Sequence, residues 1–189
     1  NKELPFFLID KSSLKKKYLN IECYKPDSLD EALQEEKNLV AATTNFLLRN
    51  GTSTKTAFQI NEQFDYFGSY INRACYNETA TITLHSLTRH INELLPLVRE
   101  LITDSVLPQE ELSIYQQNMK QRLKVSLKKS DFVAGRLIDV YLYGEKHPYG
   151  KYSSAEDFDA LKREELVDFY KKYYQQGKLI IFVAGKLPQ

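Results

Sequence analysis

The spacing of the apolar residues changes at Gly68, and this change constrains the fold more than any other feature of the sequence. In residues 29–47 and again in 57–67 the apolar residues recur at helical spacing, which is typical of amphipathic helices. The runs Ser69–Tyr76 and Thr79–Leu87 are instead rich in Thr, Tyr and Ile, and the second alternates, with apolar residues at Ala80, Ile82 and Leu84. With Asn77-Glu78 as the turn between them, they predict a β-hairpin that follows helices.

Further strands and helices are predicted on both sides of this hairpin. Short apolar runs predict strands at 4–9, 18–24 and 179–184. Helical spacing predicts one helix that ends at Asn50-Gly51, a second that is capped by Ser53 or Thr54, and others at 89–103, after Pro108, at 131–143, near 155–161 and at 163–174. This order of elements predicts an α+β fold in which helices pack on a sheet. No internal repeat or flexible linker divides residues 1–189, so we expect a single domain.

Composition excludes several classes of protein. The 189 residues are 42% hydrophobic and 27% charged, as in soluble globular domains, and the net charge of +1 favours neither nucleic acid nor membrane as a partner. No apolar run is long enough to span a bilayer. The chain begins Asn1-Lys2-Glu3, without Met or signal peptide, and we expect a unit excised from a longer multi-unit protein. The sequence leaves its compartment open.

Four blocks of the sequence together resemble a known family. They are the helix end at Gly51-Thr52, the segment Tyr66–Ser69, the loop Gly144–Gly150 with His-Pro-Tyr-Gly at its end, and the segment Asp168–Tyr174, which precedes the final strand and Gly185. As a set they resemble the pitrilysin/insulinase family of zinc metallopeptidases, which includes mitochondrial processing peptidase-like proteins. The resemblance implies a mixed, largely antiparallel sheet with helices packed on it, as in the metallohydrolase unit of that family.

The residues that hold zinc in this family are replaced here. Its inverted His-x-x-Glu-His motif aligns with Ala42 and Phe46 at the two histidines and with Asn45 at the glutamate. Neither Ala nor Phe can donate to zinc, and an amide cannot accept a proton from a metal-bound water near neutral pH. A third ligand, a Glu, is expected on the helix after Pro108, but no Asp or Glu occurs from 112 to 130, and Gln117 and Gln121 lie near its place. We therefore predict no catalytic residue, metal site or cofactor in this chain, and zinc only in a catalytic partner domain.

The resemblance implies a non-catalytic unit, because the family builds its proteins from paired units of which one holds the zinc. Such a unit helps to enclose a peptide-binding chamber, while another domain or subunit cuts the unfolded peptide. The chain alone is then inactive, within a parent protein that can be a zinc-dependent endopeptidase. The alternative is a free-standing pseudopeptidase that acts as a protein-interaction module. With no ligand role left, Phe46 is expected to point into the core or toward the sheet.

The first strand of the hairpin is the candidate peptide-binding segment. In catalytic relatives the corresponding strand takes substrate as an added β-strand, and an exposed strand edge can pair with any extended peptide. The alternative is that neighbouring structure covers this strand, or that it merely closes the sheet. The candidate residues are Ser69, Tyr70, Ile71, Asn72, Arg73, Ala74, Cys75 and Tyr76.

The histidines and cysteines have simpler interpretations. We interpret His85 and His90 as surface or helix-start residues rather than metal ligands, and His147 as part of a structural loop. Cys23 and Cys75 fall in predicted strands, and we expect two reduced thiols in or near the core. A disulfide between them remains open if these strands are neighbours.

Overall fold

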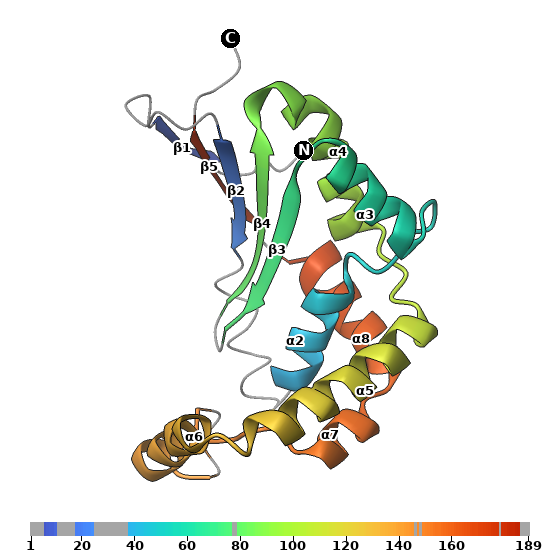
Figure 1. Ribbon diagram of the computed structural model, residues 1–189. Helices are drawn as coiled ribbons and strands as arrows, with labels where there is room; N and C mark the ends of the chain where they lie inside the picture. The colour runs from blue at the N-terminus through green and yellow to red at the C-terminus, as the bar shows by residue number, and fades with distance from the viewer. Residues whose placement is uncertain are drawn as a thin grey trace.

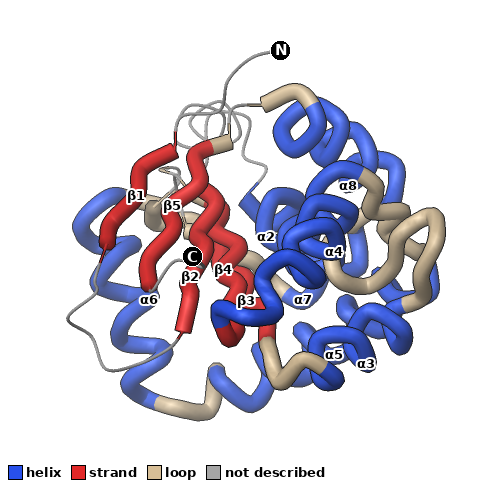
Figure 2. The backbone as a smooth tube through the Cα atoms, turned by 90° about the horizontal axis from the view of Figure 1, so that it is seen from above, coloured by secondary structure: helices blue, strands red, loops and turns tan. Residues whose placement is uncertain are grey.

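A mixed sheet forms one layer of the protein, and most of the helices lie on one side of it (Figures 1 and 2). The computed structural model describes residues 6–10, 18–24, 38–76, 79–145, 147, 149–177 and 179–185. The sheet has five strands in the order β1-β5-β2-β4-β3. The predicted α+β fold is confirmed, and so is the largely antiparallel character of its sheet.

The hairpin lies at one edge of this sheet, and the first strand lies at the other. Strand β3 (Tyr70–Cys75) pairs antiparallel with β4 (Ala80–Leu87), and β4 pairs antiparallel with β2 (Tyr18–Tyr24). Strand β5 (Ile180–Gly185) lies between β2 and β1 (Phe6–Asp10) and is parallel to β1. The final strand is thus internal to the sheet, although its residues are half-buried rather than fully buried as we expected.

The helices follow the predicted spacing closely. They are α2 (Asn38–Leu47), α3 (Ala57–Tyr66), α4 (Ile91–Thr103, after a 3₁₀ turn at Thr88–His90), α5 (Gln109–Ser126), α6 (Ser130–Tyr143), α7 (Ala155–Ala160) and α8 (Arg163–Phe169, continued by a π-helical turn at Tyr170–Gln175). The part of the first predicted helix that precedes residue 38 lies outside the described residues.

The core lies between the hairpin and the helices, with α2 at its centre. Helix α2 packs against β3 on one side and α8 on the other. Burying each Leu or Ile side chain contributes about 1.5–3 kcal/mol, so this layer supplies much of the stability. The fully buried aliphatic side chains here are Leu47, Leu48, Ile60, Leu84, Leu94, Leu101 and Leu166.

Helix α3 begins later than we predicted. Its N-cap is Thr56, whose hydroxyl accepts from Gln59 N in a capping box, and not Ser53 or Thr54. The earlier hydroxyls bind acidic side chains at the C-terminal end of α4 instead: Ser53 donates to the C-cap residue Asp104, and Thr54 donates to Glu100. Tertiary contacts with α4 thus use the side chains that would otherwise cap a longer helix.

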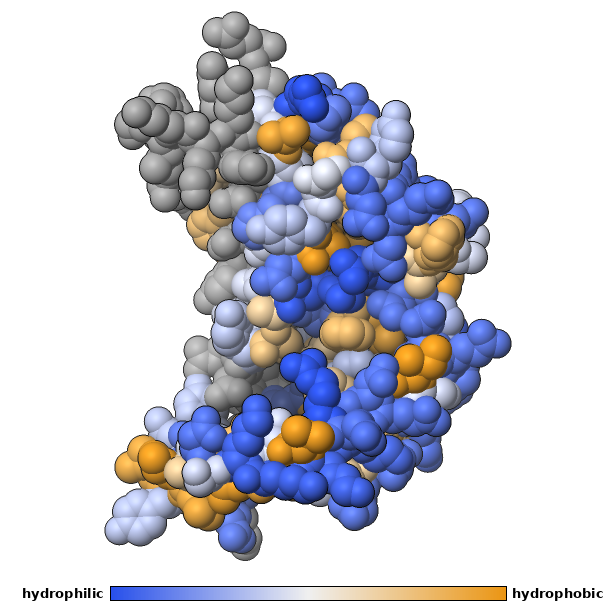
Figure 3. Space-filling view, viewed as in Figure 1, coloured by the Kyte–Doolittle hydropathy of each residue, from blue (hydrophilic) through white to orange (hydrophobic). Residues whose placement is uncertain are grey.

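Helix α6 extends away from the rest of the protein (Figure 1) and buries none of its residues. Apolar residues gather at the corresponding corner of the surface in Figure 3. Leu137, Ile138, Tyr141 and Leu142 of this helix are 61%, 58%, 90% and 66% exposed. Among the helices that the structure describes, none is long and apolar enough to cross a bilayer.

Glu100 joins the loop after α2 to α4. Its carboxylate accepts from Thr52 Oγ1 and from Lys55 Nζ, both at 2.5 Å, and from Thr54. Partial burial raises the pKa of Glu100, but the hydrogen bonds from Lys55, Thr52 and Thr54 outweigh it and lower the pKa from 4.5 to about 2. The ionised carboxylate therefore stabilises this junction.

We predict that Glu100→Gln lowers the free energy of unfolding by about 1–2 kcal/mol at pH 7, as for the loss of charged hydrogen bonds. Because the folded pKa lies below the unfolded value, the carboxylate stabilises above about pH 4.5, and its contribution is lost as the pH falls toward 2. The free energies of unfolding of wild type and variant, measured by urea titration, should thus become equal as the pH falls through this range. Glu62→Gln on the exposed face of α3 is the control. If the free energies of unfolding of E100Q and wild type differ by the same amount at every pH, Glu100 does not stabilise the junction through its charge.

Candidate functional site

Helix α2 places the three degenerate positions on two different faces. Asn45 is 1% exposed, and its Nδ2 donates to the carbonyl oxygen of Ala74 in β3 at 2.8 Å. Ala42 is half-buried and Phe46 is exposed, one turn apart on the outer face of the helix. Asn45 therefore connects α2 to the edge strand, while Ala42 and Phe46 face outward.

The prediction that Phe46 is buried in the core is wrong, because the residue is 41% exposed, although its ring does lie against Arg73 of the edge strand β3. The error has a physical reason. A catalytic zinc ligand must face a space that water and substrate can enter, since the metal keeps one coordination position open. A residue that replaces such a ligand occupies the same outward face, whatever its own polarity.

Two side chains from other elements contact the Phe46 ring. The ring of Tyr115 on α5 lies 4.8 Å from it, centroid to centroid. The guanidinium carbon of Arg73 on β3 lies 4.6 Å from the Phe46 centroid, and Arg73 Nη1 also donates to the Phe46 carbonyl oxygen. An aromatic and cationic cluster thus occupies the place where the resemblance puts a metal ligand.

The residue of α5 that contacts this cluster is Tyr115. It is not Gln117 or Gln121, near which we expected the third zinc ligand to align. Gln117 and Gln121 are exposed and line a cavity with Arg136 of α6 and Tyr152. Burial raises the pKa of Tyr115, so its hydroxyl stays neutral at physiological pH. Sequence reasoning missed Tyr115, although its helical spacing with Leu112 and Met119 marks it as part of the packed face of α5.

The side chains present do not fit a zinc ion. In the part of the chain that the structure describes, no three His, Cys, Asp or Glu side chains come together to hold a metal. Cys75 is the thiol of β3, and burial raises its pKa to about 11. It therefore stays protonated and is a poor metal ligand or nucleophile at neutral pH.

The two cysteines lie on strands that are not neighbours. Cys23 of β2 is opposite Ile82 of β4, and β4 separates β2 from β3, which carries Cys75. Two interstrand spacings amount to about 9–10 Å, beyond the roughly 7 Å between Cα atoms that a disulfide can bridge. The condition for a disulfide is not met, and Cys75 is a free thiol.

The described histidines pack on aromatic rings. His85 stacks on Tyr70 at 4.5 Å, and His90 lies 5.1 Å from Phe67, between ring centroids. His147 lies 5.4 Å from Tyr143, and its Nδ1 accepts from the backbone N–H of Tyr149. Of the three, only His85 touches the candidate strand, through its cross-strand partner Tyr70.

Strand β3 is the edge of the sheet and lies beside α2 (Figure 1). Tyr76 N donates to Thr79 O at the hairpin turn, so Tyr76 and Thr79 form a hydrogen-bonded pair. In an antiparallel ladder every second residue bonds to the partner strand. The backbone N–H and C=O groups of Ile71, Arg73 and Cys75 therefore point away from β4. Of these groups, the Arg73 N–H is bonded by the Asn72 side chain at 3.0 Å. No described strand pairs with this edge, although α2 and α3 pack beside it.

Comparison with known proteins supports the resemblance that the sequence suggested. No family model matches the chain. An uncharacterized zinc protease of Rickettsia felis is 26% identical over 139 residues, which are 72% of this chain and 34% of that protein. A probable mitochondrial-processing peptidase subunit beta of Arabidopsis thaliana is 21% identical over 159 residues, 80% of this chain and 29% of that protein. The chain spans about a third of the length of the curated relatives it matches.

Solved structures share the fold over nearly the whole chain. A peptidase M16 inactive domain from Pseudomonas fluorescens superposes with a TM-score of 0.82 at 21% identity, over 97% of this chain and 44% of that one. The first half of the periplasmic protease PqqL from Escherichia coli gives a TM-score of 0.80 at 15% identity, over 98% of this chain and 41% of that one. The chain thus has the α+β fold of these peptidase M16 structures, the first of which is described as an inactive domain.

The exposure of Phe46 predicts a modest contribution to stability. We expect Phe46→Ala to lower the free energy of unfolding by about 1–2 kcal/mol, from the loss of one aromatic pair and one cation–π contact. Phe58→Ala is the matched control, because Phe58 is 74% exposed and should change stability by less than about 0.5 kcal/mol. A loss of 3 kcal/mol or more for F46A, roughly that of a fully buried Phe, would contradict the outward position.

Proposed function

We propose that this chain is a non-catalytic unit that contributes to a peptide-binding chamber, while the zinc site lies in another domain or subunit. The apolar and amide side chains at Ala42, Asn45 and Phe46 support the first half of this proposal, because none can replace a zinc ligand or the general base. The similarity to proteins named zinc proteases supports the second half.

The binding element that we propose is the edge of β3 that pairs with no described strand. Backbone groups of Ile71 and Cys75 on this edge can pair with an extended peptide whatever its sequence. The strand contains no Pro, and its flanking Tyr70 and Tyr76 are 59% and 64% exposed, so they can contact peptide side chains. This arrangement is the observation that carries the proposal, because strand addition needs no metal and survives the loss of zinc ligands.

The alternative is a free-standing pseudopeptidase that acts as an interaction module. The two functions differ in what accompanies the chain. A unit with a His-x-x-Glu-His motif, encoded in the same gene or its neighbour, supports the chamber, and its absence from both supports the module.

We predict that the purified chain holds no stoichiometric zinc after dialysis and cleaves no unfolded peptide. The reason is that every expected donor is replaced, and that Cys75 stays protonated at neutral pH. Elemental analysis and a fluorogenic peptide assay with and without chelator measure both properties. One zinc per chain together with chelator-sensitive cleavage would refute the non-catalytic assignment.

Peptide binding at β3 can be tested by removing one outward N–H. We expect Cys75→Pro to weaken binding of an unstructured peptide about five-fold, the cost of roughly one hydrogen bond. Cys75→Ala is the control, since it removes the same side chain but keeps the N–H. Binding is followed by amide chemical shifts, which should change at Ile71, Arg73 and Cys75. Changes confined to residues 163–174, or equal affinity for C75P and C75A, would contradict strand addition.

A further inference from the structure

Arg73 is held in a fixed place on the edge strand by groups that do not neutralise it. Its guanidinium lies over the Phe46 ring, and Nη1 donates to the Phe46 carbonyl oxygen. A ring face and a carbonyl oxygen orient a cation, but neither supplies a full negative charge. Nη2 makes no hydrogen bond to the described residues, and the buried Nε has no partner there either.

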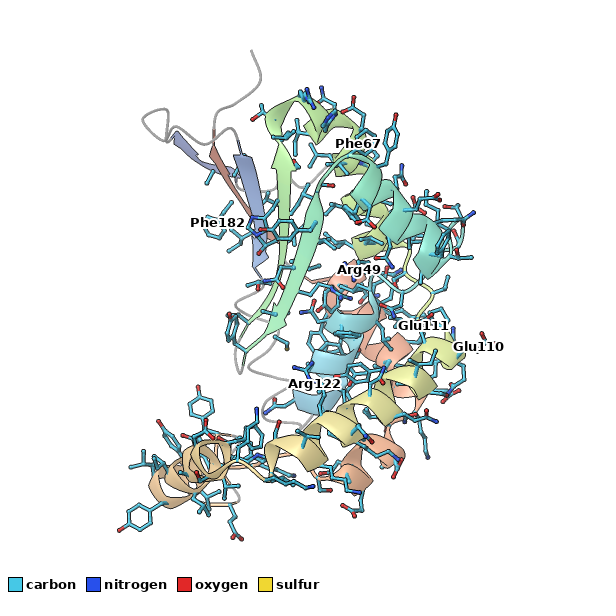
Figure 4. All side chains as sticks on the ribbon, in the orientation of Figure 1. Arg49, Phe67, Glu110, Glu111, Arg122 and Phe182 are labelled. Carbon is cyan, nitrogen blue, oxygen red and sulfur yellow. The ribbon has the colours of Figure 1, made fainter. Side chains whose placement is uncertain are left out.

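The described charge that acts on Arg73 is of the same sign. Burial and then the charge of Arg49 lower the pKa of Arg73 to about 10. Arg49 lies at the C-terminal end of α2 (Figure 4), and burial lowers its pKa too, although Asp65 partly offsets this. The face of β3 toward α2 is therefore electropositive.

Asp65 acts on Arg49, but several other acidic side chains of the described residues have partners away from this face. Glu111, at the start of α5 in Figure 4, accepts from Asn50 Nδ2 at 2.6 Å. The ion pairs of the described residues join Lys55 to Glu100 and Lys120 to Asp159, and neither includes Arg73 or Arg49. Arg122 on α5 adds a further positive charge near Tyr115.

We infer that Arg73, with Arg49 beside it, forms a carboxylate-binding site for the peptide that adds to β3. The guanidinium presents planar paired donors that match a carboxylate, and partial burial strengthens such a pair relative to water. The carboxylate can belong to an acidic side chain or to the peptide C-terminus. This inference rests on the proposed binding at β3 and gives that site a preference for acidic peptides.

The test uses one short Ser/Val/Thr peptide in three forms: neutral with both ends blocked, the same with one central Glu, and neutral with a free C-terminal carboxylate. We expect at least one carboxylate form to bind about ten-fold tighter than the neutral form, as charge-assisted hydrogen bonds allow. The form that gains affinity identifies the source of the carboxylate. The Arg73 Nε–H signal should shift on binding of that form.

Variants separate a binding role from a packing role of Arg73. Arg73→Gln should abolish the ten-fold preference, and Arg73→Lys should keep only part of it, because an ammonium lacks the planar donor pair. Arg99→Gln, on the exposed face of α4, makes the same charge change and should keep the full preference. Hairpin amide shifts like those of the wild type show that each variant is folded.

Two results overturn the inference in distinguishable ways. Equal affinity for all three peptides, with an unchanged Arg73 Nε–H signal, removes the carboxylate site but leaves strand addition intact. No binding of any form removes the proposed peptide binding at β3 together with the inference.

Discussion

The attachment of α2 to the edge strand is the interaction on which the rest of the site depends. Helix α2 buries Val40, Ala41, Thr44 and Leu47, and its buried Asn45 donates to the Ala74 carbonyl oxygen of β3. This hydrogen bond fixes which face of the helix meets the sheet, because an unpaired buried amide is costly. The rotation of α2 then determines that Phe46 points outward, under Arg73. One buried side chain, that of Asn45, thus sets the geometry of the cluster.

The chemistry of this cluster differs in kind from that of a metal site. Zinc needs donors with lone pairs, and its own charge polarises a carbonyl. Here Ala42 and Phe46 offer no donor to a metal, and guanidinium groups supply the positive charge beside the Phe46 ring. Pairing along a strand edge uses only backbone N–H and C=O groups, so it does not require the metal. Loss of catalysis and retention of peptide binding are therefore physically compatible in one unit.

The sequence predicted most of the fold, because the apolar spacing decided each element locally. The hairpin, the strand at 18–24 and the helices from α3 to α8 follow that spacing. Errors arose where tertiary contacts decided the outcome. The hydroxyls of Ser53 and Thr54 bind α4 and do not cap α3, and Phe46 faces outward because of how α2 is rotated. Tyr115 could be recognised as buried from its spacing, but its contact with Phe46 depends on how two distant helices pack.

Two features of β3, its unpaired edge and its partly buried Arg73, make the fold less stable than it could be. Its outward backbone groups face an edge that no described strand pairs, and unpaired edges are normally blocked because they invite association. Its central Arg73 is partly buried beside another arginine, with no described carboxylate to neutralise it. An apolar side chain could pack on Phe46 without that electrostatic cost. An extended peptide that carries a carboxylate would satisfy both features at once, by pairing with the edge and by neutralising Arg73, which is why we assign them to one binding site.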